Sequence, residues 1–121
     1  MSIKVKGYHH AGVVVKDLDR AEWFYGQLMG MSKLPRPEFS IKGAWYEMAS
    51  GAQLHLMVSE EAVQGSNRHV ALEVENFEET VQVLKENEIR FQTEPGKRHD
   101  GSDAMSILDT EGNLVEITAH G

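Results

Sequence analysis

Two stretches of the chain repeat one pattern: Tyr8–Leu18, with the sequence YHHAGVVVKDL, and Arg68–Phe77, with the sequence RHVALEVENF. In each, a histidine precedes an apolar run that contains β-branched residues. Two polar residues follow, and then an apolar residue that starts a helical pattern. His69 follows His10 by 59 residues, and Phe77 follows Leu18 by the same number. This constant offset indicates that one structural unit is written twice.

A second pair of stretches repeats further along each half. Gln53–Val58 (QLHLMV) matches Asn113–Thr118 (NLVEIT), so that Glu116 follows His55 by 61 residues. Each half therefore contributes two side chains that can bind a metal, at matched positions. The four candidate metal ligands are His10, His55, His69 and Glu116.

The alternation of side chains along a strand predicts which face each candidate occupies. Leu54 and Leu56 flank His55, and Val115 and Ile117 flank Glu116, so both candidates lie opposite a purely apolar face. His69 has the same relation to the apolar residues that follow it. The strand of His10 is apolar in both phases and gives no such indication. We expect the apolar faces to pack on helices and the other faces to line a cup.

Length and composition limit the kind of protein this is. The 121 residues fit one compact domain, about 4–58 forming a first module and about 69–118 a second, joined by a polar linker over 59–68. A net charge of −7 disfavours binding to nucleic acid or to anionic membranes. The absence of cysteine excludes thiolate chemistry. With no apolar run long enough for a membrane span and no signal-peptide pattern, we expect a cytoplasmic protein.

Hydrophobic periodicity and turn residues predict a strand, a helix and then two or three strands in each half. In the first half we expect a strand over 4–15, a helix over 18–29, a loop punctuated by Pro35 and Pro37, and a hairpin of strands over 44–49 and 52–58. In the second half we expect a strand over 69–74, a helix from Phe77 to about Asn87, a strand over 89–93, a polar loop over 95–101 and a hairpin over 104–118.

Three imidazoles and one carboxylate suit a divalent cation that prefers nitrogen and hard oxygen donors, such as Zn, Ni, Co, Mn or Fe. Such an ion can polarise a carbonyl, hold an enolate or acidify a bound water. The sequence therefore predicts a metal site with open positions for a small substrate. His9, His99 and His120 have no counterpart in the other half, and we expect them at the surface.

The duplicated histidine strand and helix, together with Asp109–Glu116 (DTEGNLVE), resemble the vicinal oxygen chelate superfamily over about Val5 to Thr118. That superfamily includes glyoxalase I, bleomycin- and fosfomycin-resistance proteins, extradiol dioxygenases and methylmalonyl-CoA epimerase. Gly43–Trp45 followed by Leu54–Met57 is similar to its glyoxalase I-like branch.

The resemblance implies an α+β fold, with two tandem βαβββ modules forming a cupped mixed sheet around the metal held by His10, His55, His69 and Glu116. It also implies a homodimer, whose sites in several relatives draw ligands from both chains. Where glyoxalase I has a carboxylate on the last strand of the first half, this chain has His55. Glu116 is then the one candidate base among the four ligands.

The leading hypothesis is a divalent-metal-dependent lyase or isomerase of the glyoxalase type. Its small oxygenated substrate would chelate the ion through two neighbouring oxygens while Glu116 moves a proton. Trp45, Arg68 and Arg98 are the candidate substrate-binding residues, and Arg68, Lys97 or Arg98 could hold an anionic tail. Alternatives are an extradiol-type dioxygenase using His10, His69 and Glu116, a thiol transferase of the fosfomycin-resistance type, and a ligand-sequestering protein of the bleomycin-resistance type.

Overall fold

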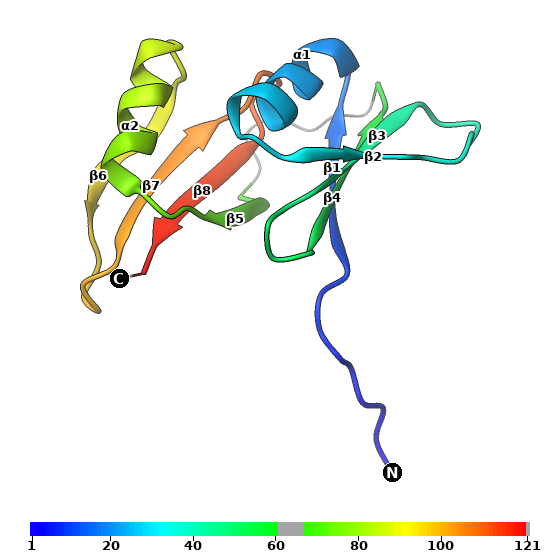
Figure 1. Cartoon of the computed structure of the whole chain (residues 1–121), viewed down its shortest axis with the longest axis horizontal. Coiled ribbons are helices and arrows are strands. Elements are labelled where there is room, and N and C mark those ends of the chain that lie inside the picture. Colours follow the sequence, from blue (N-terminus) through cyan, green and yellow to red (C-terminus); the bar gives the residue numbers. More distant parts are fainter. Residues whose placement is uncertain (61–66, 121) are drawn as a thin grey trace. The chain divides into compact units, whose positions relative to one another are not determined.

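The computed structural model describes residues 1–60 and 67–120, and the chain forms two compact units, Met1–Ala62 and Val63–Gly121 (Figure 1). Each unit contains one four-stranded mixed sheet and one helical segment. The α+β class and the βαβββ module predicted from the sequence are therefore confirmed. Part of the predicted linker, 61–66, lies outside the described residues.

The sheet of the first unit has the strand order β1-β4-β3-β2. Strands β1 and β4 are parallel, and the other neighbours are antiparallel. Its elements are β1 (His10–Val15), the helix α1 (Leu18–Glu22), the π-helical segment η1 (Trp23–Leu28), β2 (Ser32–Leu34), β3 (Gly43–Glu47) and β4 (Gln53–Val58).

The sheet of the second unit repeats this topology in the order β5-β8-β7-β6, with β5 and β8 parallel. Its elements are β5 (His69–Glu73), the helix α2 (Phe77–Glu86), β6 (Phe91–Lys97), β7 (Asp103–Leu108) and β8 (Leu114–Ala119). In both units the helix follows the first strand directly. An N-cap carboxylate or amide starts each helix: Asp17 accepts the Arg20 N–H, and Asn76 accepts the Glu79 N–H.

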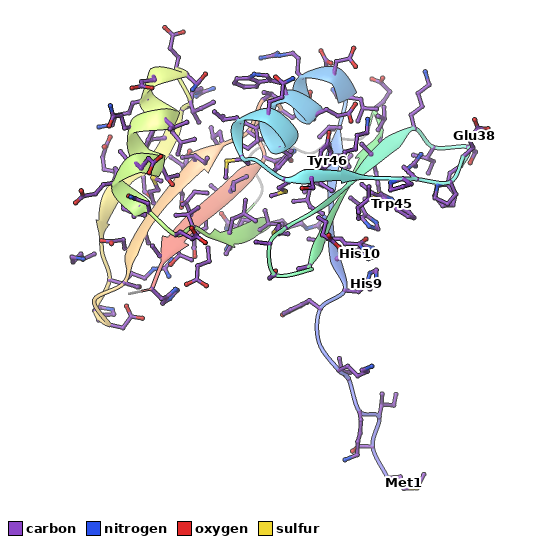
Figure 2. The ribbon with its side chains drawn as sticks, viewed as in Figure 1. Met1, His9, His10, Glu38, Trp45 and Tyr46 are labelled. Carbon is purple, nitrogen blue, oxygen red and sulfur yellow. The ribbon has the colours of Figure 1, made fainter. Side chains whose placement is uncertain are left out.

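Burial follows the alternation predicted from the sequence. Leu54 and Leu56 on β4, and Val115 and Ile117 on β8, are fully buried. On β3, the neighbouring residues Trp45 and Tyr46 lie on opposite faces (Figure 2). Tyr46 donates a hydrogen bond to Glu22 (2.8 Å), which ties β3 to α1, and Trp45 is left on the other face. The face of the sheet away from the helix is therefore the one that carries the candidate site.

Four local predictions need correction. The first strand begins at His10, not near Lys4, and residues 1–9 are exposed. The predicted helix over 18–29 changes to π geometry at Trp23, where the Met29 N–H donates to Phe24 O (2.9 Å). The short strand β2 was missed because the prolines after it mark a loop. Strand β6 runs to Lys97, through the predicted loop, because a register shift between Thr93 and Gly96 accommodates Pro95 and pairing with β7 resumes at Gly96.

Close backbone packing explains one glycine next to the site. A Cβ at Gly43 would collide with the carbonyl oxygen of Leu56 on the adjacent strand, so only glycine fits where β3 starts.

No helix of the described residues is long and apolar enough to cross a membrane.

Candidate metal centre

The first pair of candidate ligands lies on the parallel strands β1 and β4. Gly12 pairs with His55, which places His10, two residues before Gly12, on the same face of the sheet as His55. The two imidazole rings stack with their centroids 3.9 Å apart and their planes 13° from parallel. The strand register alone thus brings two imidazoles together.

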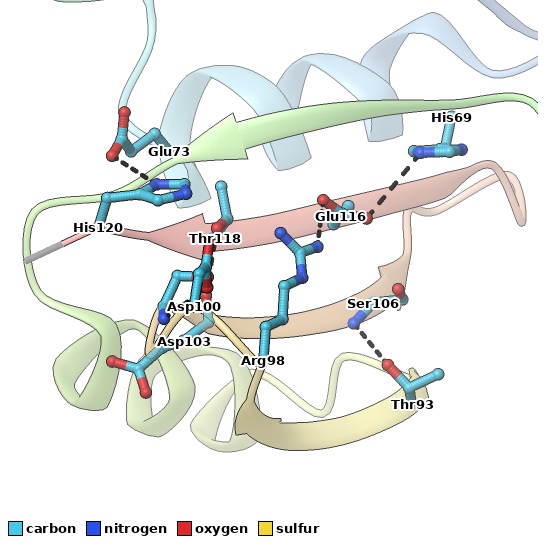
Figure 3. A network of polar contacts seen from close by, with 11 residues as sticks. His69, Glu73, Thr93, Arg98, Asp100, Asp103, Ser106, Glu116, Thr118 and His120 are labelled. Atoms are coloured by element: carbon cyan, nitrogen blue, oxygen red, sulfur yellow. Dashed lines mark hydrogen bonds and ion pairs between the residues drawn. The ribbon is translucent and has the colours of Figure 1, made fainter.

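The second pair lies on the parallel strands β5 and β8. Ala71 pairs with Glu116, and His69 lies two residues before Ala71 on the same face. The His69 Nε2 atom is 4.0 Å from the Glu116 Oε1 atom (Figure 3). The offset between the two side chains is the same as in the first unit. The two pairs therefore occupy equivalent register positions in the two sheets.

The hydrogen bonds of His69 and His10 hold these rings as metal ligands are commonly held. The Nδ1 atom of His69 is 2.9 Å from the carbonyl oxygen of Asn67, which can only accept, so Nδ1 carries the proton and Nε2 keeps a lone pair. The Nδ1 atom of His10 lies 2.9 Å from Nδ1 of His9, so one imidazole donates to the other, and in the tautomer in which His10 donates its Nε2 also keeps a lone pair. A backbone carbonyl or second imidazole behind the ring thus orients each Nε2.

His55 differs from the other two imidazoles. It is buried between the rings of His10 and Trp45, and the Trp45 ring stacks on it at 4.4 Å and 13°. Its Nε2 atom lies 2.9 Å from Oε1 of Gln53. Burial lowers the pKa of His55 below the ordinary 6.5, and the positive charges of His10, His9 and Arg36 lower it further. The ring is therefore neutral at pH 7, which is the form that binds a metal.

Glu116 is held between an imidazole and a guanidinium. Its Oε2 atom is 2.6 Å from Nη2 of Arg98, while Oε1 faces His69 (Figure 3). Arg98 was predicted to bind substrate, and the structure shows that its charge compensates this carboxylate. Trp45 lies against His55, inside the candidate site, and Arg68 is exposed.

These residues fit a divalent cation by donor type, although neither unit alone completes a site. Within residues 1–60 and 67–120, no three or more His, Cys, Asp or Glu side chains form a group that could hold a metal. Each unit provides two donors, whereas protein metal sites normally use three or four. Because a metal lies in the plane of the imidazole that binds it, the stacked rings of His10 and His55 do not both point at one ion. Ligation by both requires one ring to rotate.

Three residues of the site were not among the predicted site residues: His9, Gln53 and Arg36. His9 was expected to be an isolated surface histidine, and it is exposed, but its contact with His10 gives it a role. Gln53 precedes His55 by two positions and so lies on the same face of the strand. The two-residue spacing could therefore have predicted that Gln53 belongs to the site. The proximity of Arg36 to His55 could not have been predicted, because it depends on the conformation of a loop.

The chain belongs to the Glyoxalase/Bleomycin resistance protein/Dioxygenase superfamily, whose family model matches residues 7–117. Mitochondrial methylmalonyl-CoA epimerase from Bos taurus is 28% identical over 125 residues, covering 90% of this chain and 71% of the bovine protein. A solved structure from Bacillus anthracis, described as a glyoxalase family protein, matches the fold with a TM-score of 0.87 and 22% identity over 100% of both chains.

A fosfomycin resistance protein from Listeria monocytogenes, solved in a tetragonal crystal form, matches with a TM-score of 0.78 and 17% identity, covering 98% of this chain and 94% of that one. At this identity the solved structures support the fold and no particular activity. The family model over residues 7–117 confirms the predicted resemblance to the superfamily.

The environment of His55 predicts how it titrates in the metal-free protein. NMR of the imidazole protons should give a pKa below 6.5, and Trp45→Ala, which opens the ring to water, should raise that pKa toward 6.5. Because His55 of the unfolded chain takes up a proton first, the free energy of unfolding should decrease as the pH falls below 6.5. Trp23→Ala, on the helical segment, is the matched control, and an unchanged His55 pKa in Trp45→Ala would refute the assignment to burial.

Proposed function

We propose that this protein is a divalent-metal-dependent lyase or isomerase of the glyoxalase type. Its substrate is a small molecule with two neighbouring oxygens, and the reaction transfers a proton at a carbon next to a carbonyl group. One observation carries the proposal: two pairs of metal-binding side chains occupy the same register positions in two copies of one module. Four donors at positions that the fold repeats form a coherent ligand set.

The metal site proposed here combines the His10 and His55 pair with the His69 and Glu116 pair. Two imidazole Nε2 atoms with oriented rings, a third neutral imidazole and a carboxylate match Zn, Ni, Co, Mn or Fe. Such an ion supplies Lewis acidity, which lowers the pKa of a C–H bond next to a coordinated carbonyl.

Glu116 is the proposed base, because it is the one carboxylate among the four side chains and can take and return a proton. Arg98 fixes one carboxylate oxygen at 2.6 Å and leaves the oxygen that faces His69 for the proton. Trp45 provides an apolar wall next to His55. Arg68 and Arg98 remain the candidates for contacts with substrate on the second module.

Similarity to methylmalonyl-CoA epimerase supports the isomerase form of this proposal. Epimerisation next to a carbonyl requires that one proton be removed and returned. The same two steps at a hydroxyl-bearing carbon, with return to the neighbouring carbon, isomerise an adduct of a 2-oxoaldehyde and a thiol. One base and one stabilised enolate oxygen serve both reactions, so both substrate classes belong in the test.

The ligand set predicts the pattern of metal binding. His10→Ala, His69→Ala and Glu116→Gln should each weaken Co(II) or Ni(II) binding roughly 10- to 1,000-fold, measured by competition with a chromogenic chelator, because each removes one of a few donors. The control variants His99→Ala and Glu94→Gln change exposed residues of the second module, which also carries His69 and Glu116. They should leave the affinity for metal unchanged. If the wild-type protein itself shows no affinity for any of these ions, the ligand-sequestering alternative is favoured and the metal proposal fails.

The base predicts solvent exchange. In D₂O, protein loaded with Ni(II), Co(II) or Zn(II) should introduce deuterium next to the carbonyl of a malonyl-type thioester or a methylglyoxal hemithioacetal, detected by proton NMR. Glu116→Gln should reduce the rate by about 10²- to 10⁴-fold, the usual contribution of a general base, while Glu94→Gln should not. Metal-loaded protein that exchanges none of these substrates would contradict the proton-transfer reaction without affecting the metal site.

The hydrogen bond between His55 and Gln53 favours a second candidate function, that of an extradiol-type dioxygenase. Gln53 occupies Nε2 of His55, whereas His10, His69 and Glu116 form the two-histidine, one-carboxylate set typical of non-haem Fe(II) enzymes. Retention of Fe(II), together with oxygen uptake that depends on a catechol, would support this reaction over proton transfer. The absence of catechol-dependent oxygen uptake in protein loaded with Fe(II) or Mn(II) would exclude it.

We further propose a homodimer whose sites combine the first pair of one chain with the second pair of the other. Strands β1 and β5 are each terminal in their sheets, and unpaired strand edges favour pairing with another strand. Ile3, Val5 and Tyr8, just before β1, expose large apolar side chains, which is typical of an interface.

Complementation tests the shared site. A verified heterodimer of His10→Ala and Glu116→Ala chains should regain about half of the wild-type metal capacity, because one of its two sites receives both intact pairs. Each homodimeric variant should stay defective. A heterodimer without recovery would show that each site is built from a single chain.

A further inference from the structure

Arg36 lies in the loop between β2 and β3, on the first unit, and carries a charge that its described neighbours do not neutralise. Its Nη2 atom donates to the carbonyl oxygen of Ile41 at 2.6 Å, and its guanidinium carbon lies 4.9 Å from the centre of the Phe39 ring. Among the described residues no carboxylate lies within ion-pair distance of it. The guanidinium is thus positioned by a carbonyl dipole and an aromatic face.

One nitrogen of this guanidinium has unused hydrogen-bonding capacity. The Nε atom is buried and has no hydrogen-bond partner in the described structure. A buried cationic N–H without an acceptor costs free energy, and such sites are commonly completed by a ligand or by water. The fork of guanidinium donors matches the paired oxygens of a carboxylate or phosphate.

The position of Arg36 connects it to the candidate metal centre. The Phe39 ring lies 6.0 Å from Trp45, and Trp45 stacks on His55, so a continuous row of rings leads from the guanidinium to the ligand pair. At Gly43 a Cβ would come within 3.2 Å of Nη2, so this glycine leaves room for the guanidinium.

We infer that Arg36 binds an anionic group of the substrate, a carboxylate or a phosphate, at the outer end of the Phe39–Trp45–His55 row. The inference rests on the proposed function, because it assigns the substrate of that site to the class of small anionic oxygen compounds. Exposed Phe39 and Ile41 flank the cation and would contact the apolar part of such a substrate. Phe39, which covers the guanidinium, moves aside when the anion enters.

This assignment adds an arginine of the first module to the two candidates, Arg68 and Arg98, on the second. Arg98 shares its charge with Glu116, whereas no ion pair is found for Arg36 among the described residues. Arg36 lies on the other module, beside the aromatic wall. The substrate anion and the proposed base would then be held by different modules.

Anion binding to metal-free protein tests the inference separately from catalysis. Malonate and inorganic phosphate are titrated into ¹⁵N-labelled protein while the two indole N–H signals, Trp23 and Trp45, are followed by NMR. The Trp45 signal should shift saturably and the Trp23 signal should not. Arg36→Met should weaken this binding by roughly 10- to 100-fold, and Arg36→Lys by less, since a charge-assisted hydrogen bond is lost or altered.

Arg20→Met, an exposed arginine on α1, is the matched control and should bind like wild type. Dimethyl malonate, which has no charge, should not shift Trp45. Tighter binding of malonate identifies a carboxylate as the substrate anion, and tighter binding of phosphate identifies a phosphate. An absent Trp45 shift, or an equal one in folded Arg36→Met, would overturn the inference. Arg36→Met should still bind Co(II), so that loss of the metal site is recognised as a separate failure.

Discussion

The structure depends on the parallel pairing of the first and last strands of each module. In a parallel pair, the register decides which side chains share a face, and a slip by one residue would move each candidate ligand to the opposite face. The buried residues that flank His55 and Glu116 hold this register, because a slip would expose Leu54, Leu56, Val115 and Ile117. The positions of the candidate ligands are thus fixed by the core on the other side of each sheet.

The sequence allowed the fold to be predicted well because the duplication is visible in two independent pairs of strands. The alternation around His55 and Glu116 also placed their side chains correctly. What failed were features set by backbone details. The π geometry from Trp23 leaves no mark in the apolar spacing, β2 is only three residues long, and β6 continues through Pro95 because bulges interrupt its pairing. The charge partner of Glu116 was not predictable either, because Arg98 is distant in sequence and reaches it through the β6–β7 connection.

The two modules hold their candidate ligands in different ways. His69 and Glu116 form a charged arrangement, with a guanidinium on one carboxylate oxygen and a backbone carbonyl behind the imidazole. His55 is instead held by stacking between Trp45 and His10, in surroundings that keep it neutral. A stacked, uncharged ring costs little to keep near a second imidazole, whereas two protonated rings would repel each other. The neutral ring of His55 can therefore stack on His10 without repulsion between two charged rings.

The equal register of unlike pairs has a consequence for the evolution of the chain. Two copies of the first module would offer four imidazoles and no carboxylate, and two copies of the second would offer two imidazoles and two carboxylates. Only a site that combines one pair from each module contains a single carboxylate. In the proposed site that carboxylate, Glu116, is then the one group that takes the proton from the substrate and returns it. After duplication, a single difference at the strand position of His55 and Glu116 is thus sufficient to make the two halves of the proposed site chemically different.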